Sequence, residues 1–109
     1  MALYREFESK EEIDAQYDVE VSVPDFSIYA DLFIGESAKA REQLDPVLDI
    51  RFGPTLDETL DIFPADDPNA PILVFIHGGY WRMLSSKEFS FAAVAPVARG
   101  YTVVVTNYS

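Results

Sequence analysis

Cysteine is absent from all 109 residues of the sequence. A chain without thiols forms no disulfide bond, no thiolate metal site and no cysteine nucleophile. The absence agrees with a reducing compartment.

Positive charge is scarce. Lysine and arginine together number 8 against 19 aspartates and glutamates, which gives a formal net charge of −11. Binding a polyanion requires a cationic surface. We therefore expect neither nucleic acid nor an anionic membrane as a partner, and we interpret the acidity as a source of solubility.

Long apolar runs are missing as well, and none approaches the ~20 residues that cross a bilayer. The first residues are charged and lack an apolar segment, so no signal peptide is predicted. An apolar content of 49% fits a folded globular chain. The length predicts a single domain over residues 1–109, and we expect it in the cytoplasm.

The first 46 residues carry the signals of two helices. Ser9 and Glu12 form a capping-box pattern that predicts a short helix toward Tyr17. Apolar residues then recur at helical spacing, which predicts a helix over Pro24–Leu44, ended by Asp45-Pro46. We expect the aromatic stripe of the second helix to pack in the core, although it is also compatible with lining a pocket.

Residues 47–109 alternate between strands, turns and one helix. Leu48–Phe52 and Glu58–Phe63 each alternate apolar with polar residues, which predicts a half-buried antiparallel hairpin. Segment 64–71 is rich in proline and aspartate and is predicted to be a loop. Its two aspartates lack the spacing of a metal site, and we expect no metal or cofactor.

The last third of the chain reads as strand, helix, strand. Ile72–Ile76 is continuously apolar, as expected for a strand covered on both faces. A helix is predicted over residues 85–99, with a serine cap and with a kink or division at Pro96. A second buried strand is predicted over residues 102–106. This order predicts a right-handed βαβ unit and an α/β fold.

Two glycines follow the first of these strands directly, in His77-Gly78-Gly79-Tyr80-Trp81. Open α/β sheets bind ligands at the carboxyl ends of their strands. Glycine permits dihedral angles that turn consecutive amides toward one point. Amides arranged in this way stabilise the negative oxygen of an acyl-transfer intermediate. A plain glycine turn is the simpler alternative, which the flanking histidine and Tyr-Trp disfavour.

This pentapeptide resembles the HGGxW motif of the kynurenine formamidase (arylformamidase) group of α/β-hydrolases, a relative of the HGGG motif of lipases and esterases. Tyr101–Tyr108 looks like the next strand of that group. The resemblance implies the N-terminal part of an α/β-hydrolase fold, with helices in 1–46 and a hairpin plus βαβ unit of a mostly parallel sheet in 47–109. It also implies a serine hydrolase that acts on a small formamide, ester or thioester without a cofactor.

The resemblance assigns roles within the motif. The backbone amides of Gly79 and Tyr80 correspond to catalytic oxyanion-hole donors. His77 and Gly78 are expected to brace this loop; His77 is not expected to be the general base, because that histidine follows the nucleophile in α/β-hydrolases. Trp81 is expected either to line the substrate pocket or to be an ordinary packing residue.

The nucleophile has no counterpart in these residues. No Gly-x-Ser-x-Gly occurs and His77 is the single histidine, so no Ser-His-Asp triad can be assembled from this chain. We expect the remainder of the hydrolase as a continuing or separate chain, with a homo-oligomer also open. We further expect strand 102–106 to leave a long apolar edge unpaired.

Two alternatives remain beside the hydrolase. One is a non-catalytic, truncated hydrolase fragment that acts as an interaction module, because the nucleophile and the catalytic histidine are missing. The other is a dinucleotide-binding βαβ unit, which ranks last because the glycine loop is not G-x-G-x-x-G.

Overall fold

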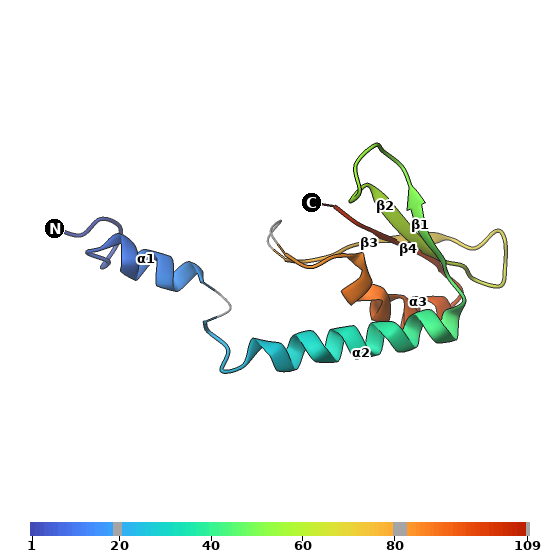
Figure 1. Cartoon of the computed structure of the whole chain (residues 1–109), viewed down its shortest axis with the longest axis horizontal. Coiled ribbons are helices and arrows are strands. Elements are labelled where there is room, and N and C mark those ends of the chain that lie inside the picture. The colour runs from blue at the N-terminus through green and yellow to red at the C-terminus, as the bar shows by residue number, and fades with distance from the viewer. Residues whose placement is uncertain (19–20, 80–82, 109) are drawn as a thin grey trace.

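The computed structural model describes residues 1–18, 21–79 and 83–108. The elements run in the order α1 (Lys10–Tyr17), α2 (Phe26–Leu44), β1 (Val47–Arg51), β2 (Thr59–Phe63), β3 (Ile72–Ile76), the 3-10 helix η1 (Ser86–Ala93), α3 (Val94–Ala98) and β4 (Thr102–Thr106). The sheet and the helices from α2 onward form one body, whereas α1 lies apart from it at the N-terminal end (Figure 1).

Side-chain caps begin both N-terminal helices. The Ser9 hydroxyl accepts a hydrogen bond from the Glu12 amide and the Glu12 carboxylate accepts one from the Ser9 amide, so the predicted capping box is present. Asp25 caps α2 by accepting from the Ser27 amide, and α2 therefore begins two residues inside its predicted range. It ends at Leu44, and its C-cap Asp45 has the left-handed conformation with φ of 49°.

The sheet has the strand order β1-β2-β4-β3. β1 pairs with β2 and β2 with β4 in the antiparallel sense, while β3 pairs with β4 in the parallel sense. The predicted hairpin and the parallel pair joined by a helical connection are both present. The prediction of a mostly parallel sheet is wrong for the described strands, because only the β3–β4 pairing is parallel and the β1–β2 and β2–β4 pairings are antiparallel.

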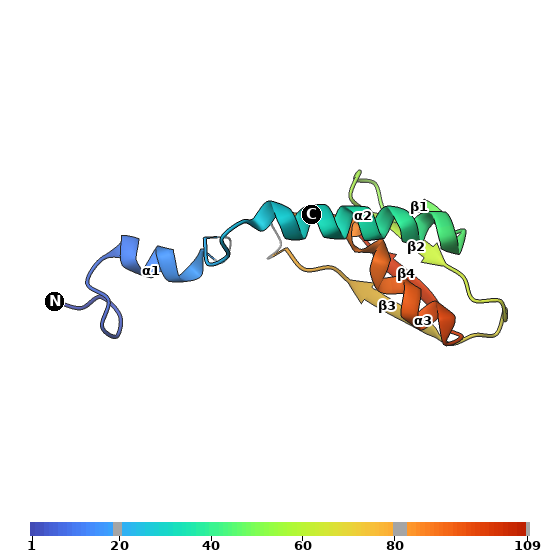
Figure 2. The ribbon, with the colours of Figure 1, turned by 90° about the horizontal axis from the view of Figure 1, so that it is seen from below.

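The core lies between the sheet and η1. Its buried apolar residues are Phe63, Ala93, Val103 and Val105. Leu73 and Phe75 of β3 pack against them from the same face of the sheet. The outer layer is α2, which crosses on the helical side of the sheet (Figure 2). Its Phe33 ring stacks on Phe91 of η1 at 5.2 Å, so this part of the aromatic stripe does pack inward.

β1 does not follow the predicted alternation of buried apolar and exposed polar residues. Leu48 and Phe52 are 39% and 55% exposed, and Ile50 alone in the strand is half buried. The pairing register shifts between Val47 and Ile50, and Asp49 has a φ of 58°. A β-bulge of this kind adds a residue to one strand and turns the side chains beside it. The alternation of apolar and polar residues in the sequence therefore predicted the wrong side chains of β1 to be buried.

The segment predicted as one helix over residues 85–99 consists of two. Ser85 caps η1 in a second capping box, completed by Glu88. The division expected at Pro96 falls at Val94 instead, where the 3-10 geometry of η1 gives way to α3. Pro96 lies in the first turn of α3, a position at which proline is tolerated.

The two edges of the sheet are formed by β1 and β3. β4 lies between β2 and β3, so the prediction that strand 102–106 presents the unpaired edge is wrong. The prediction that Ile72–Ile76 is covered on both faces is also wrong for the described part of the chain. Ile72, Val74 and Ile76 are 68%, 58% and 67% exposed, because α2, η1 and α3 all lie on the other face.

Candidate functional site

The glycine loop, which we define as residues 77–86, joins β3 to η1. Gly79 has a φ of 133°, a backbone conformation that side chains strongly disfavour. A Cβ atom added to Gly79 would lie 2.1 Å from the Met83 carbonyl oxygen. The Gly79 carbonyl oxygen accepts a hydrogen bond from the Met83 amide at 3.2 Å. Glycine is thus required at position 79 on two separate grounds.

The amides of Gly78 and Gly79 do not enter the sheet ladder. Neither donates a hydrogen bond to a backbone carbonyl among the described residues. They follow the last residue of β3, at the carboxyl edge of the parallel β3–β4 pair. This is the edge at which open α/β sheets bind ligands.

His77 holds the start of the glycine loop from within the protein. Its side chain is 3% exposed and stacks between the rings of Tyr108, at 4.1 Å, and Phe89, at 5.6 Å. His77 Nδ1 lies 2.7 Å from the Gly78 carbonyl oxygen. Because that oxygen can only accept, the geometry assigns the imidazole proton to Nδ1.

The same tautomer leaves Nε2 of His77 as an acceptor. Nε2 is buried and has no hydrogen-bond partner among the described residues. Native proteins leave few buried polar atoms unpaired, and each typically costs about 1–3 kcal/mol. This nitrogen is therefore suited to accept a hydrogen bond from a group beyond those described.

Two residues that follow β4 contact both ends of the glycine loop. The Tyr108 hydroxyl donates to the His77 carbonyl oxygen at 2.6 Å. Asn107 Oδ1 accepts from the buried Ser86 amide at 3.0 Å. The backbone amide of Asn107 donates to the Thr59 carbonyl oxygen at 2.9 Å, which connects Asn107 to β2.

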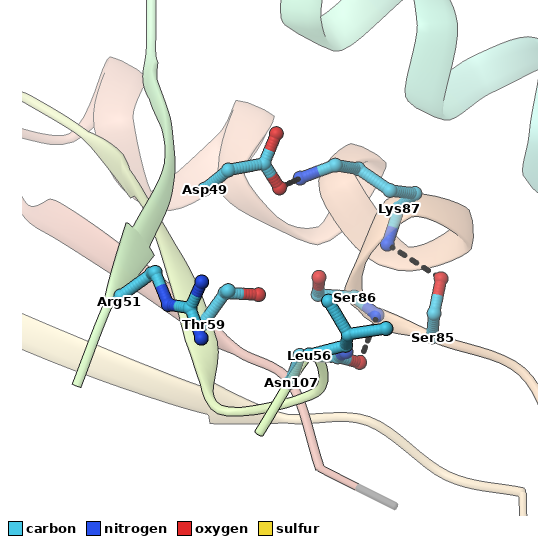
Figure 3. Close-up of a pocket in the computed structure, with 8 residues that line it drawn as sticks. All are labelled: Asp49, Arg51, Leu56, Thr59, Ser85, Ser86, Lys87 and Asn107. Carbon is cyan, nitrogen blue, oxygen red and sulfur yellow. Dashed lines mark hydrogen bonds and ion pairs between the residues drawn. The ribbon is translucent and has the colours of Figure 1, made fainter. Parts of the chain in front are cut away.

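A cavity of about 340 Å³ lies beside the η1 end of the loop (Figure 3). Residues of β1, the hairpin loop, β2, the start of η1 and Asn107 line it. Lys87 Nζ contacts both carboxylate oxygens of Asp61 at 2.7 Å and reaches Asp49 Oδ1 at 2.9 Å. Asp61 is fully buried, so this lysine neutralises a carboxylate of the core and is not free for a ligand.

The structure brings some predicted site residues together and leaves others undescribed. His77, Gly78 and Gly79 follow β3 directly, and His77 Nδ1 lies 2.7 Å from the Gly78 carbonyl oxygen. Tyr80 and Trp81, the second predicted oxyanion donor and the predicted pocket residue, lie outside the described residues. The cavity is lined by none of the residues of the pentapeptide that the structure describes.

Sequence reasoning missed Asn107 and Tyr108 as site residues. A signal for them was available, because they follow directly on a strand predicted to be parallel to Ile72–Ile76. The carboxyl ends of parallel neighbours meet at one edge, so residues just beyond the two strands lie close together.

The chain is similar in sequence to proteins named kynurenine formamidase. The Danio rerio protein is 30% identical over an alignment of 109 positions, which covers 93% of this chain and 37% of the relative. The Salmo salar protein is 33% identical over 72 residues, and the Drosophila melanogaster protein 38% identical over 55 residues. No family model matches the chain.

A solved structure shares the fold. A Silicibacter protein, provisionally described as a thioesterase, superposes with a TM-score of 0.78 at 22% identity, over 85% of this chain and 36% of that protein. The resemblance to the kynurenine formamidase group and the α/β-hydrolase fold class are thus confirmed. The chain spans little more than a third of the length of the Danio rerio relative.

Membrane-spanning helices and clusters of metal-ligating side chains are both absent from the described residues. No helix in the described ranges is long and apolar enough to cross a membrane. No group of three or more metal-ligating side chains occurs among residues 1–18, 21–79 and 83–108.

Proposed function

We propose that this chain supplies the oxyanion loop of a serine hydrolase that cleaves a formamide, ester or thioester. The observation that carries the proposal is the position and backbone conformation of Gly79. Gly79 lies at the carboxyl edge of the sheet, has a backbone conformation suited to glycine, and its amide has no backbone acceptor among the described residues. The amide of Tyr80 is the second proposed donor.

The proposed chemistry assigns these donors to the charged intermediate. A serine outside the 109 residues bonds to the substrate carbonyl carbon and gives its proton to a histidine, and the C=O electron pair moves onto oxygen. Amides aimed at that oxygen stabilise it without reorganising. When the C=O bond re-forms, the leaving group departs with the proton from the histidine, and water later releases the acyl group by the same steps.

The relatives suggest a substrate class. Their name, kynurenine formamidase, denotes hydrolysis of the formyl amide of kynurenine, an aromatic amine. We therefore propose an N-formyl arylamine as the first substrate to assay, with aryl esters and thioesters as the alternatives.

Activity is tested in two stages. The isolated chain should show no turnover of N-formylkynurenine or an aryl ester above buffer, because it holds no nucleophile elbow. A chimera in which these 109 residues replace the matching part of the Danio rerio relative should be active. Serine-dependent turnover by the pure chain of 109 residues would contradict the proposal that the nucleophile lies outside these residues.

The oxyanion role is tested by removing one donor from the active chimera. Glycolic acid in place of Gly79 replaces the amide N–H with an ester oxygen and keeps the glycine dihedral angles. A proline is less suitable, because its φ near −65° cannot reach 133°. We expect kcat to fall by about 10²–10³ with KM nearly unchanged. An equal loss in kcat and in substrate binding would count against the assignment.

A second candidate function is an interaction module, favoured by the exposure of β3. Ile72, Val74 and Ile76 are more than half exposed on the face of the sheet without helices. Register places Val74 beside Val104, and Val104 beside Ile62, so the apolar surface continues across three strands. A uniformly apolar strand in an α/β sheet is normally buried on both faces.

The two edges of the sheet differ in a way that supports docking at β3. The β1 edge carries a bulge with Asp49 and Arg51, features that discourage edge-to-edge pairing. The β3 edge has neither a charge nor a bulge. We propose that its occupant is the part of a formamidase-like hydrolase that has no counterpart in these 109 residues.

Docking is tested by mixing the chain with a polypeptide that contains the unmatched part of the Danio rerio relative. We expect a one-to-one complex by gel filtration with light scattering, and loss of that complex with Val74→Glu. Ile28→Glu is the matched control, because Ile28 is 63% exposed on α2, away from the sheet. Equal effects of the two variants, or self-association of the chain alone, would contradict this occupant.

A further inference from the structure

The directions of the glycine-loop amides are set by the carbonyl oxygens beside them. Each peptide unit is a rigid plane, and in a trans peptide the carbonyl of one residue points opposite to the N–H of the next. No cis peptide bond occurs among the described residues. A hydrogen bond to a loop carbonyl therefore fixes where the following amide points.

Two successive planes of the loop are held in this way. The Tyr108 hydroxyl binds the His77 carbonyl oxygen at 2.6 Å and so fixes the direction of the Gly78 amide. His77 Nδ1 binds the Gly78 carbonyl oxygen at 2.7 Å and so fixes the direction of the Gly79 amide. Stacking of the Tyr108 ring on His77, with an angle of 9° between the planes, holds the imidazole that makes the second contact.

The far end of the loop is held by the neighbouring residue. Asn107 Oδ1 accepts from the Ser86 amide, and both residues are buried. The Ser86 amide follows the Ser85 cap of η1, so this bond fixes the point where the loop becomes a helix. Asn107 is itself held by its backbone bond to Thr59 on β2.

We propose that Asn107 and Tyr108 are positioning residues that together hold both ends of the glycine loop and thereby aim the Gly79 amide. Neither touches the reacting atoms. Tyr108 orients the first two peptide planes of the loop, one directly and the other through His77. Asn107 fixes the position of the start of η1. The catalytic consequence rests on the proposed function, whereas the structural effect does not.

The structural effect is measured on the chain of 109 residues by NMR relaxation of the Gly79 amide. We expect an order parameter near the rigid value of about 0.85 in the original chain and below about 0.6 in Tyr108→Phe, which keeps the ring and loses the hydroxyl. Tyr101→Phe is the matched control, because Tyr101 is 40% exposed and lies outside the loop. It should leave Gly79 unchanged.

Asn107 is tested with two variants that separate folding from positioning. Asn107→Ala leaves the Ser86 amide without its acceptor. Asn107→Asp keeps an acceptor oxygen in place and is made together with Asp57→Asn, because Asp57 Oδ1 lies 3.4 Å from Asn107 Nδ2 and would repel a second carboxylate. We expect Asn107→Ala to lower the Gly79 order parameter and Asn107→Asp to restore most of it. Circular dichroism identifies any variant that fails to fold, and the folded Asn107→Asp and Tyr108→Phe chains then decide the question.

The catalytic consequence is measured in the active chimera. Tyr108→Phe should lower kcat by about 10- to 10²-fold with KM within twofold of the original, and Tyr101→Phe should change neither. A Gly79 amide that stays ordered in Tyr108→Phe and Asn107→Ala would overturn the positioning role. A Gly79 amide that loosens without any fall in kcat would leave that role standing and would overturn the proposed oxyanion function instead.

Discussion

At the scale of single residues, the two glycines of the loop differ in what they tolerate. Gly79→Ala forces a Cβ to within 2.1 Å of the Met83 carbonyl oxygen at a φ of 133°. We expect a loss of about 1–3 kcal/mol in the free energy of unfolding, or a rearranged turn. Urea denaturation and NMR shifts of Met83 would detect either result.

Gly78→Ala is the control for that change. A Cβ at Gly78 meets no atom within 4 Å, and Gly78 is not among the positive-φ residues. Its free energy of unfolding should change by less than about 0.5 kcal/mol. Similar losses at the two positions would mean that the turn geometry described for Gly79 is wrong.

A buried charge gives a second prediction at this scale. Lys87→Met leaves the Asp61 carboxylate, which is fully buried, without its cation. Removing one partner of a buried pair typically costs about 3–5 kcal/mol, and we treat this as an upper limit because the Lys87 side chain is 35% exposed. Urea denaturation measures the loss.

The control for Lys87 is a lysine in a surface pair. Lys39 contacts Glu36 with both side chains about half exposed or more, so Lys39→Met should cost no more than about 1 kcal/mol. Asp61→Leu combined with Lys87→Met should recover much of the stability, because no uncompensated charge remains. A double variant as unstable as Lys87→Met alone would exclude the charge as the cause.

At the scale of elements, α1 provides a prediction on pH. The Glu12 carboxylate accepts hydrogen bonds from the backbone amides of Glu8 and Ser9. These bonds, the one from Glu8 having the larger effect, hold the pKa of Glu12 below its ordinary value of 4.5. A depressed folded pKa favours the helix above pH 4.5, and this contribution is lost as the pH falls through the lowered value. Helicity of α1, followed by NMR shifts, should therefore decrease on acidification.

Glu12→Gln removes this titration while keeping the length of the side chain. Its α1 shifts should lack the acid-dependent step that the original chain shows. An unchanged step in Glu12→Gln would assign the pH dependence to another carboxylate.

At the scale of the whole molecule, α1 forms no part of the core. None of its residues is buried, and it extends from one end of a molecule that measures 62 × 31 × 23 Å. Deletion of residues 1–18 should change the free energy of unfolding of the sheet and η1 by less than about 0.5 kcal/mol. A larger loss in urea denaturation would show that α1 docks on the body in solution.

Local signals determined much of the fold. The capping box at Ser9, a serine cap before η1 and the end of α2 before Asp45 depend on neighbours within four residues, so the sequence alone predicted them. The strands on either side of the glycine loop followed from runs of apolar residues. The loop itself was predictable for the same reason, since a glycine pair after an apolar strand needs no distant contact to be found.

The tertiary structure decided what depends on residues far apart in the chain. Because β4 lies between β2 and β3, the apolar edge strand is β3 and not β4. The bulge at Asp49 changed which side chains of β1 are buried. The contacts of Asn107 and Tyr108 with the glycine loop span 21 and 31 residues. Such pairings follow from strand order, which local propensity does not encode.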